Sequence, residues 1–480
     1  MFLPILSKIK KPNFLLCLPI LLAHSTLYAF GGGEWASEAG LEGTFFAEES
    51  ETSDTRSNFS LFISTEYYVD WNDGADSFIF SPRLRLDQND SERNTFDITE
   101  LAWVHVEDTW EMRTGIREVG WGVSLMGGVV DVINQTNIVE DFFGSKLGQP
   151  MINLSLVQDW GILDLFVLTG FRRAAFPGPD SRPGLPFEMS TNESDVPLQD
   201  REIIGLDYAA RWQHSWESFE WALSYFYGTS READVDFNYS VAEPGIISTY
   251  NNINQLGAEL LYIWNGYSFK YESKTVVGAK NRDAGLGTYT AGLIGFEYTW
   301  GSALGSDFDV MWDISYMHDD RKSSFTAIME KDVFALGVLN FNDEFDTRIA
   351  LGSIWDVEDD EGIFLINAER RIAETWKVTM LAVYFYAEQE DTPPEVTEQQ
   401  SAAELDRLLR GFELFGDSEL ERIIDSFGSL VLEYGVFSDE VGDAVENLQT
   451  IVDSVTFQEN NKLAIMKDES FARVILTHYF

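Results

Sequence analysis

The sequence ends with Ser470-Phe-Ala-Arg-Val-Ile-Leu-Thr-His-Tyr-Phe480, and the fold can be argued outward from these eleven residues. Every second side chain belongs to a mostly apolar set, which His478 interrupts, and the side chains between are more polar, with Ile475 as the exception. The apolar set is Ala472, Val474, Leu476 and Phe480, and the polar set is Arg473, Thr477 and Tyr479. Since successive side chains of a strand point to opposite faces, the pattern predicts a terminal β-strand between an apolar and a wetter medium. Both a closing strand of a soluble β-sandwich and a strand of a membrane-spanning β-barrel fit this pattern.

Composition and charge help to decide between a soluble β-sandwich and a membrane-spanning β-barrel. The chain has 480 residues, of which 14% are aromatic, a content typical of barrels with aromatic girdles at two membrane interfaces. Its net charge is −47, from 33 basic and 80 acidic residues, which excludes binding to nucleic acid through the phosphates. The acidic excess would face divalent cations or keep long loops solvated.

Residues 1–29 have the features of a cleaved secretory signal peptide. They contain Lys8, Lys10 and Lys11 but no acid, then an apolar run over 14–23 and a small residue, Ala29, at the cleavage point. The ten-residue apolar run is too short to cross a bilayer as a helix, and no later run is long enough either. The only cysteine, Cys17, lies inside this segment, so the mature chain would have no thiol to mispair in an oxidising periplasm. An exported chain of this kind is either periplasmic or an outer-membrane barrel.

From Glu34 onward the chain alternates between strand patterns and turns, and about eighteen strands are expected. They fall near 35–48, 58–72, 76–90, 94–109, 111–122, 150–159, 161–172, 203–215, 218–231, 252–265, 267–280, 286–303, 307–319, 328–342, 345–358, 362–375, 377–389 and 461–480. Long and short connections alternate: 123–149 and 173–201 are long, whereas 159–161 and 265–266 are tight turns. This asymmetry is typical of outer-membrane barrels, and a sandwich has no reason to keep it. We therefore expect an all-β fold, a transmembrane antiparallel barrel built from residues 30–394 and 461–480.

The connection 123–149, after the fifth strand, is expected to fold into the lumen. Its apolar residues would be exposed in an external loop, and a charge facing lipid at mid-depth costs about 2–4 kcal/mol, so the charged wall residues also belong inside. One interpretation is a constriction with a transverse field that orients polar solutes. In the other, the arginines only pair with carboxylates and stiffen the barrel. The predicted pore-lining residues are Arg83, Arg85, Arg113, Arg117 and Arg211 on the wall and Asp131, Asn134, Glu140 and Asp141 on the loop.

Several of these residues also carry a family resemblance. The run Arg113-x-Gly-x-Arg117 leading to Trp121-Gly122, with Asp131-Val-Ile-Asn134 and Leu147-Gly-Gln-Pro150, resembles a family of large, mostly uncharacterised proteobacterial outer-membrane proteins. The end at Phe480 resembles the C-terminal assembly signal of Gram-negative barrels. In size and strand count the chain is similar to the eighteen-stranded alginate-export channel, but that channel implies a strongly basic lumen, so alginate is not expected here. The resemblance implies an outer-membrane location, contact with outer-membrane lipid and lipopolysaccharide, and recognition of the last strand by the assembly machinery.

Residues 395–460 depart from the strand pattern. The apolar period changes to about 3.6, and Ser401 with Glu404 and Ser418 with Glu421 form capping boxes, which predicts an insert of about three helices. It has sixteen acidic residues against three arginines, and strand parity places it outside the cell. It would cap the barrel, plug it or bind a partner, and repulsion among its acids favours the cap over the plug. The proline-rich run 174–187 is either a stiff loop over the mouth or a plain loop.

The sequence offers little for catalysis. It has no Gly-x-Ser-x-Gly elbow, no His-Glu-x-x-His and no phosphate-binding loop. His318, beside Asp319 and Asp320, is the only weak catalytic or metal candidate, and it is more simply a polar rim residue. We therefore expect no enzyme and no cofactor, but a porin-like channel for passive passage of a small or medium polar solute, constricted by the loop 123–149. The alternative is a surface structural or binding barrel with a closed lumen that acts through its external loops and helical insert.

Overall fold

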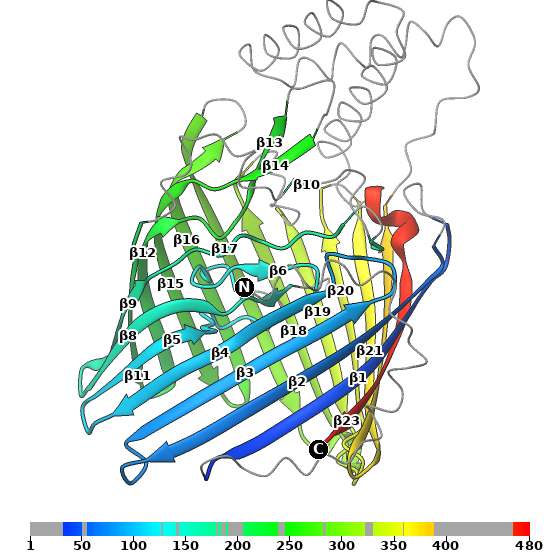
Figure 1. Cartoon of the computed structure of the whole chain (residues 1–480), viewed down its shortest axis with the longest axis horizontal. Coiled ribbons are helices and arrows are strands. Elements are labelled where there is room, and N and C mark those ends of the chain that lie inside the picture. Colours follow the sequence, from blue (N-terminus) through cyan, green and yellow to red (C-terminus); the bar gives the residue numbers. More distant parts are fainter. Residues whose placement is uncertain are drawn as a thin grey trace, which may run out of the picture.

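The computed structural model describes residues 32–49, 55–125, 128–140, 144–178, 181–183, 189–190, 205–238, 245–281, 285–321, 330–358, 360–387 and 464–480. These residues form a closed antiparallel β-barrel of 18 strands (Figure 1). The barrel closes because β1 (Glu34–Phe46) pairs with β2 (Ser57–Trp71) on one side and with β23 (Phe471–Tyr479) on the other. The predicted fold class and strand number are confirmed.

The remaining barrel strands follow one another around the ring in chain order. They are β3 (Asp76–Asp87), β4 (Thr95–Val106), β5 (Trp110–Arg117), β8 (Gln149–Gln158), β9 (Gly161–Leu168), β11 (Asp207–Trp216), β12 (Phe219–Thr229), β15 (Asn252–Trp264), β16 (Tyr267–Asn281), β17 (Gly285–Trp300), β18 (Asp309–Asp319), β19 (Asp332–Asn340), β20 (Arg348–Asp356), β21 (Gly362–Ala373) and β22 (Trp376–Tyr386). The short elements outside the ring are β6 (Thr136–Asn137), β7 (Ser145–Lys146), β10 (Met189–Ser190), β13 (Asp234–Asn238), β14 (Gly245–Thr249) and two 3₁₀ turns, Ala303–Gly305 and Ala464–Glu469.

The last strand closes the ring in the register that its alternation requires. Its polar set points into the barrel, where the Arg473 side chain donates to the Thr44 hydroxyl at 3.1 Å, and its apolar set points out. Phe480 extends the pairing beyond β23: its N–H donates to the Ser37 carbonyl at 2.9 Å, and its carbonyl accepts from the Ser37 N–H at 3.0 Å. The terminal residue is therefore part of the seam between the first and last strands.

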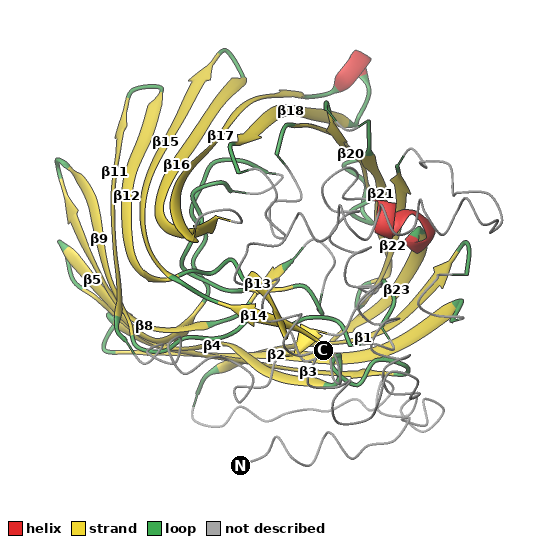
Figure 2. Cartoon of the chain, turned by 90° about the horizontal axis from the view of Figure 1, so that it is seen from above, coloured by secondary structure: helices red, strands yellow, loops and turns green. Residues whose placement is uncertain are grey.

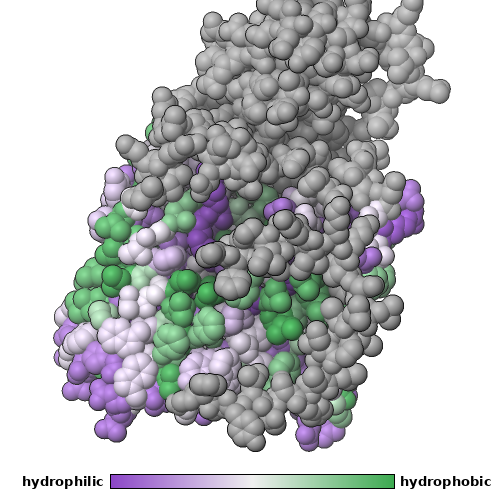
Figure 3. All heavy atoms as spheres, viewed as in Figure 1, coloured by the Kyte–Doolittle hydropathy of each residue, from purple (hydrophilic) through white to green (hydrophobic). Residues whose placement is uncertain are grey.

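The other strands show the same division into an inner and an outer face. On β16, Lys270, Glu272 and Lys274 point inward and are at most 7% exposed, whereas the outward Phe269 and Tyr271 are more than 40% exposed. The charged side chains of this strand therefore line the lumen, as the alternation predicts. Apolar side chains extend across the middle of the visible wall, with polar ones toward its lower end (Figure 3).

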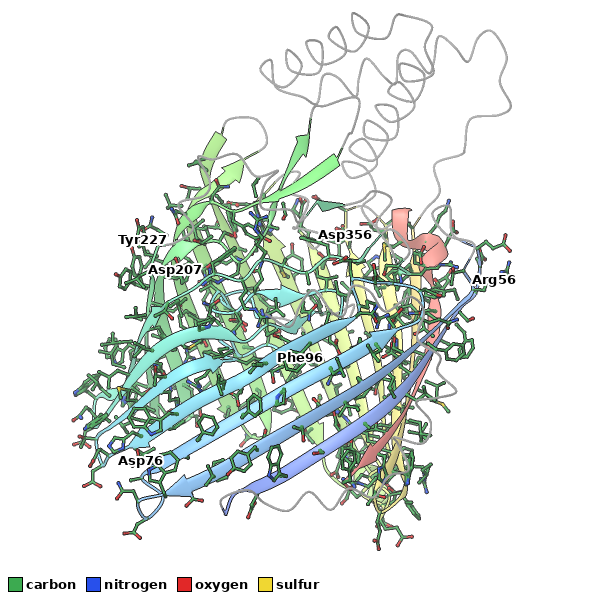
Figure 4. All side chains as sticks on the ribbon, in the orientation of Figure 1. Arg56, Asp76, Phe96, Asp207, Tyr227 and Asp356 are labelled. Atoms are coloured by element: carbon green, nitrogen blue, oxygen red, sulfur yellow. The ribbon has the colours of Figure 1, made fainter. Side chains whose placement is uncertain are left out.

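Turn geometry distinguishes the two ends of the barrel. The β2–β3 turn places Asn72, Asp73 and Gly74 in the left-handed region, and the β15–β16 turn does so for Asn265 and Gly266, which suits tight hairpins. These short turns share one end with the C-terminus (Figure 1), and the long connections occupy the other. In Figure 4, Asp76 at the start of β3 marks the short-turn end, and Arg56 and Asp356 lie near the opposite rim.

Three expectations fall on residues outside the described ranges. They are the signal peptide 1–29, the helical insert 395–460 and the loop residue Asp141. Within the described ranges, no helix combines the length and the apolarity needed to cross a membrane.

Candidate functional site

The connection between β5 and β8 folds into the barrel, as predicted, and forms a shelf along its inner wall (Figure 2). Val129, Val130, Val132 and Ile133 are at most 5% exposed. They pack, with Trp121, against inward-facing side chains of the wall, which are Met151, Phe166, Leu168, Ala209, Phe226, Ile253, Val276, Tyr289, Ala291 and Leu293. Burying these apolar residues inside the ring is what holds this face of the loop against the wall.

A single carboxylate on the barrel wall accepts hydrogen bonds from four backbone N–H groups of the loop. Glu272 of β16 is fully buried, and its Oε1 accepts the N–H groups of Val123 and Ser124, both at 2.7 Å. Its Oε2 accepts the N–H of Val129 at 2.7 Å and that of Val130 at 3.4 Å. Two separate parts of the loop backbone, at 123–124 and at 129–130, therefore bind one side chain. Sequence reasoning missed this role, because Glu272 is far from the loop in sequence and follows the same alternation as its neighbours.

Asn134 ties the two ends of the loop together. Its Oδ1 accepts the N–H of Val119 at 2.8 Å, and its Nδ2 donates to the carbonyls of Arg117 and Leu147, both at 2.8 Å. It is 1% exposed, and its side chain bonds to backbone groups at the two ends of the loop. The Arg231 side chain adds a bond from outside the loop, donating to the Ile133 carbonyl at 3.0 Å.

On the opposite side of the shelf, Glu140 contacts the arginines of β3 directly. Arg85 donates to its two carboxylate oxygens at 2.9 and 3.0 Å, and Arg83 reaches the same group at 2.5 Å. Burial opposes ionisation of Glu140, but Arg85 and Arg83 hold the pKa of this carboxyl below its usual range. Arg85 also pairs with the buried Glu42 at 3.3 Å. Arg83, Arg85 and Glu140 therefore form direct ion pairs, as in the interpretation in which the arginines stiffen the barrel. They do not face each other across open water.

Two of the other predicted residues, Arg211 and Asp131, lie in separate ion pairs. Arg211 binds Glu259 of β15 through two nitrogens, at 2.7 and 2.9 Å, and Asp131 pairs with Lys146 of the loop at 3.3 Å. Burial raises the pKa of the Asp131 carboxyl, against the effect of Lys146. Each pair holds a charge that would be costly to bury alone.

A cavity of about 280 Å³ lies where the loop leaves β5. Its lining includes Arg113 and Arg117 from β5, Asp164 from β9 and Arg211 from β11. Three of the predicted arginines therefore meet at one place, which the sequence could not indicate because their strands, β5 and β11, are three positions apart around the ring.

A second connection follows the outer rim as a strap, the described residues 169–178 and 181–183. It begins after β9, and Arg172 pairs with Asp97 of β4 at 2.7 Å. At its far end Arg182 is 2% exposed and reaches the β1–β23 seam, where it pairs with Glu469 at 3.0 Å. Its other nitrogens donate to the carbonyls of Thr55, Glu48 and Asp468 at 2.6–2.8 Å. The described part of the proline-rich run is thus anchored across several strands and is not a plain loop.

The catalytic candidate does not form a site. His318 is exposed on the outer face of β18, whereas Asp319 is buried on the inner face and pairs with Arg321 at 2.5 Å. Asp320 accepts from the backbone and hydroxyl of Thr290. In the described part of the chain, no group of three or more His, Cys, Asp or Glu side chains is placed to hold a metal ion.

Comparison with known proteins finds solved structures that align with this chain. No protein-family model matches the sequence, and no curated protein matches it. Pseudomonas aeruginosa OpdQ aligns with a TM-score of 0.47 and 9% identity, over 94% of this chain and 99% of that one. A mutant of the Rh. blastica porin aligns with a TM-score of 0.38 and 11% identity, over 93% and 100%. Pseudomonas putida OprB aligns with a TM-score of 0.36 and 11% identity, over 67% and 89%.

Proposed function

We propose that this chain is an outer-membrane channel through which small or medium polar solutes pass passively, with the loop 123–149 as its constriction. The observation that carries the proposal is the shelf itself. A loop that enters the lumen and is held there by Glu272, Asn134 and the Arg83–Arg85–Glu140 pairs supports a narrowed passage through the barrel. Barrels of 16–18 strands are wide enough to leave an aqueous path.

The side of the lumen that the loop leaves uncovered supports an open path. In the described residues, the polar contacts of the shelf reach from β3 to β16, and its apolar contacts extend to β17 and β18. The two carboxylate contacts of the shelf thus involve β16 and β3, and β19, β20, β21 and β22 follow β18 around the rest of the ring. A solute would therefore pass between the shelf and this wall.

The outer surface fits an outer-membrane location. The barrel strands have 8 to 16 residues, against about 9–11 needed to cross a bilayer when tilted. Tryptophans gather at or near the short-turn end, as in an aromatic girdle: Trp71, Trp103, Trp110, Trp160, Trp216, Trp264, Trp300 and Trp376. We propose that membrane lipid and lipopolysaccharide surround the barrel, and that the assembly machinery recognises the strand that ends at Phe480.

Solute entry into liposomes tests the proposal. Full-length protein, folded in detergent and reconstituted, is placed in isosmotic solutions of neutral polar solutes of increasing size. We expect swelling with the small solutes and a size limit set by the shelf. If folded protein gives no swelling with any solute, the lumen is closed and the surface-binding alternative replaces the channel.

A further inference from the structure

We propose that the cavity beside the shelf is a binding site for the carboxylate group of a small, singly charged solute, with Arg117 as its main contact. This inference rests on the proposed function, because it concerns a solute on its way through the lumen. Three arginines line the cavity, Arg113, Arg117 and Arg211, and they differ in whether each has an ion-pair partner.

Two of these arginines are already occupied. Arg211 makes its two-nitrogen contact with Glu259 and also donates to Gln213, and Arg113 pairs with Glu111. Arg117 differs: its one described hydrogen bond is a long one, 3.4 Å to the Asn153 side chain, and it has no ion-pair partner among the described residues. A guanidinium with free donors therefore faces a cavity in a part of the barrel where its neighbours are satisfied.

The chemistry of the lining selects among anions. A guanidinium presents two parallel N–H groups that match the two oxygens of a carboxylate. Glu118 and Asp164 also line the cavity, and they would repel a second negative charge on the solute. The lining has three arginines and two carboxylates, a net charge of +1, which a monocarboxylate neutralises and a phosphate or a dicarboxylate exceeds.

The other side of the cavity is apolar and aromatic. Trp121 and Phe166 both line it, with ring centroids 5.9 Å apart in an edge-to-face arrangement. Trp121 belongs to the shelf and Phe166 to β9, so the cavity joins the constriction to the wall. These rings offer a surface for a short apolar or aromatic body attached to the carboxylate.

Binding of benzoate to full-length protein in detergent micelles, measured by titration calorimetry, tests the site whether or not the barrel conducts. We expect saturable binding of benzoate, no binding of the neutral benzamide, and weaker binding of inorganic phosphate. R117Q should weaken benzoate binding about 10-fold to 100-fold, as expected for loss of a charge-assisted pair, and R117K should lie between. R348Q is the matched control, since Arg348 also points into the lumen but pairs with Glu369, at 3.8 Å and away from the cavity.

Benzoate binding that is absent from the folded protein, or that is equal in R117Q and the wild type, would overturn the site. Phosphate binding as tight as benzoate binding would overturn the assignment to a monocarboxylate. Liposome swelling fails or succeeds independently of these results. Swelling without benzoate binding refutes only the binding site, whereas benzoate binding without swelling refutes only the channel.

Discussion

Replacing Glu272 by glutamine should release the shelf from the wall while leaving the barrel intact. Each carboxylate oxygen of Glu272 accepts two N–H groups from the loop. A glutamine amide has one such oxygen, and its NH₂ group would face two buried N–H donors. Two hydrogen bonds to a charged acceptor would be lost, at about 1.5–2 kcal/mol each, so docking of this turn should weaken by about 3–4 kcal/mol.

Hydrogen exchange reports this change directly. The amides of Val129 and Val130 are buried and bonded to Glu272, so they exchange only when the turn leaves the wall. Since about 1.4 kcal/mol is a factor of ten, E272Q should speed their exchange by roughly 100-fold to 1,000-fold. Exchange in β16 itself should stay slow.

The matched control is E297Q. Glu297 points into the same lumen from β17 and pairs with Lys270, which keeps a second partner in Asp313 at 2.8 Å. This substitution removes a luminal carboxylate of the same type without a contact to the loop. The reasoning is refuted if E272Q exchanges as slowly as the wild type, or if E297Q accelerates the loop amides equally.

Two further predictions concern the rim and the shelf's other anchor. R182A should lower the temperature at which the barrel unfolds, read as loss of the faster gel migration of the folded form, because breaking a buried ion pair costs about 3–5 kcal/mol. R56A removes an exposed ion pair and should leave this temperature unchanged. Equal effects of the two substitutions would contradict the anchoring role of Arg182. Since the pKa of Glu140 is lowered when the loop docks on β3, Glu140 stabilises the docked loop fully above its ordinary pKa of 4.5. This stabilisation is lost as the pH falls through the lowered pKa. Fluctuations of the channel current should therefore stay constant as the pH is lowered to about 4.5 and increase below it. The double variant R83Q/R85Q should show increased fluctuations already at neutral pH. Wild-type fluctuations that begin well above pH 4.5 would contradict the pairing.

Much of the barrel could be predicted because strand alternation is a local property. The terminal strand shows it within eleven residues, and the charged positions of β16 show it as plainly. The asymmetry of the connections then indicated which end carries the loops. The inward fold of 123–149 also followed from sequence, since its valines and isoleucines need a buried surface.

The partners of individual charges could not be predicted. The contacts of Glu140 with Arg85 and of Arg182 with Glu469 join residues that are far apart in sequence and depend on how the loops cross the closed barrel. Alternation states which face a side chain occupies but not how far around the ring its partner lies. For the same reason the sequence showed Arg117 as one of five similar arginines, although among the described residues it is the one of the five without an ion-pair partner.

Single-channel conductance of the full-length protein in a planar bilayer tests the central claim most directly, with E272Q measured beside the wild type and E297Q. An open lumen narrowed by a docked loop predicts steady conductance steps in the wild type and in E297Q. In E272Q it predicts larger steps with more fluctuation, because the undocked turn no longer holds a fixed width. Folded protein that inserts without any steps would contradict the channel, and identical steps in E272Q would contradict the loop as its constriction.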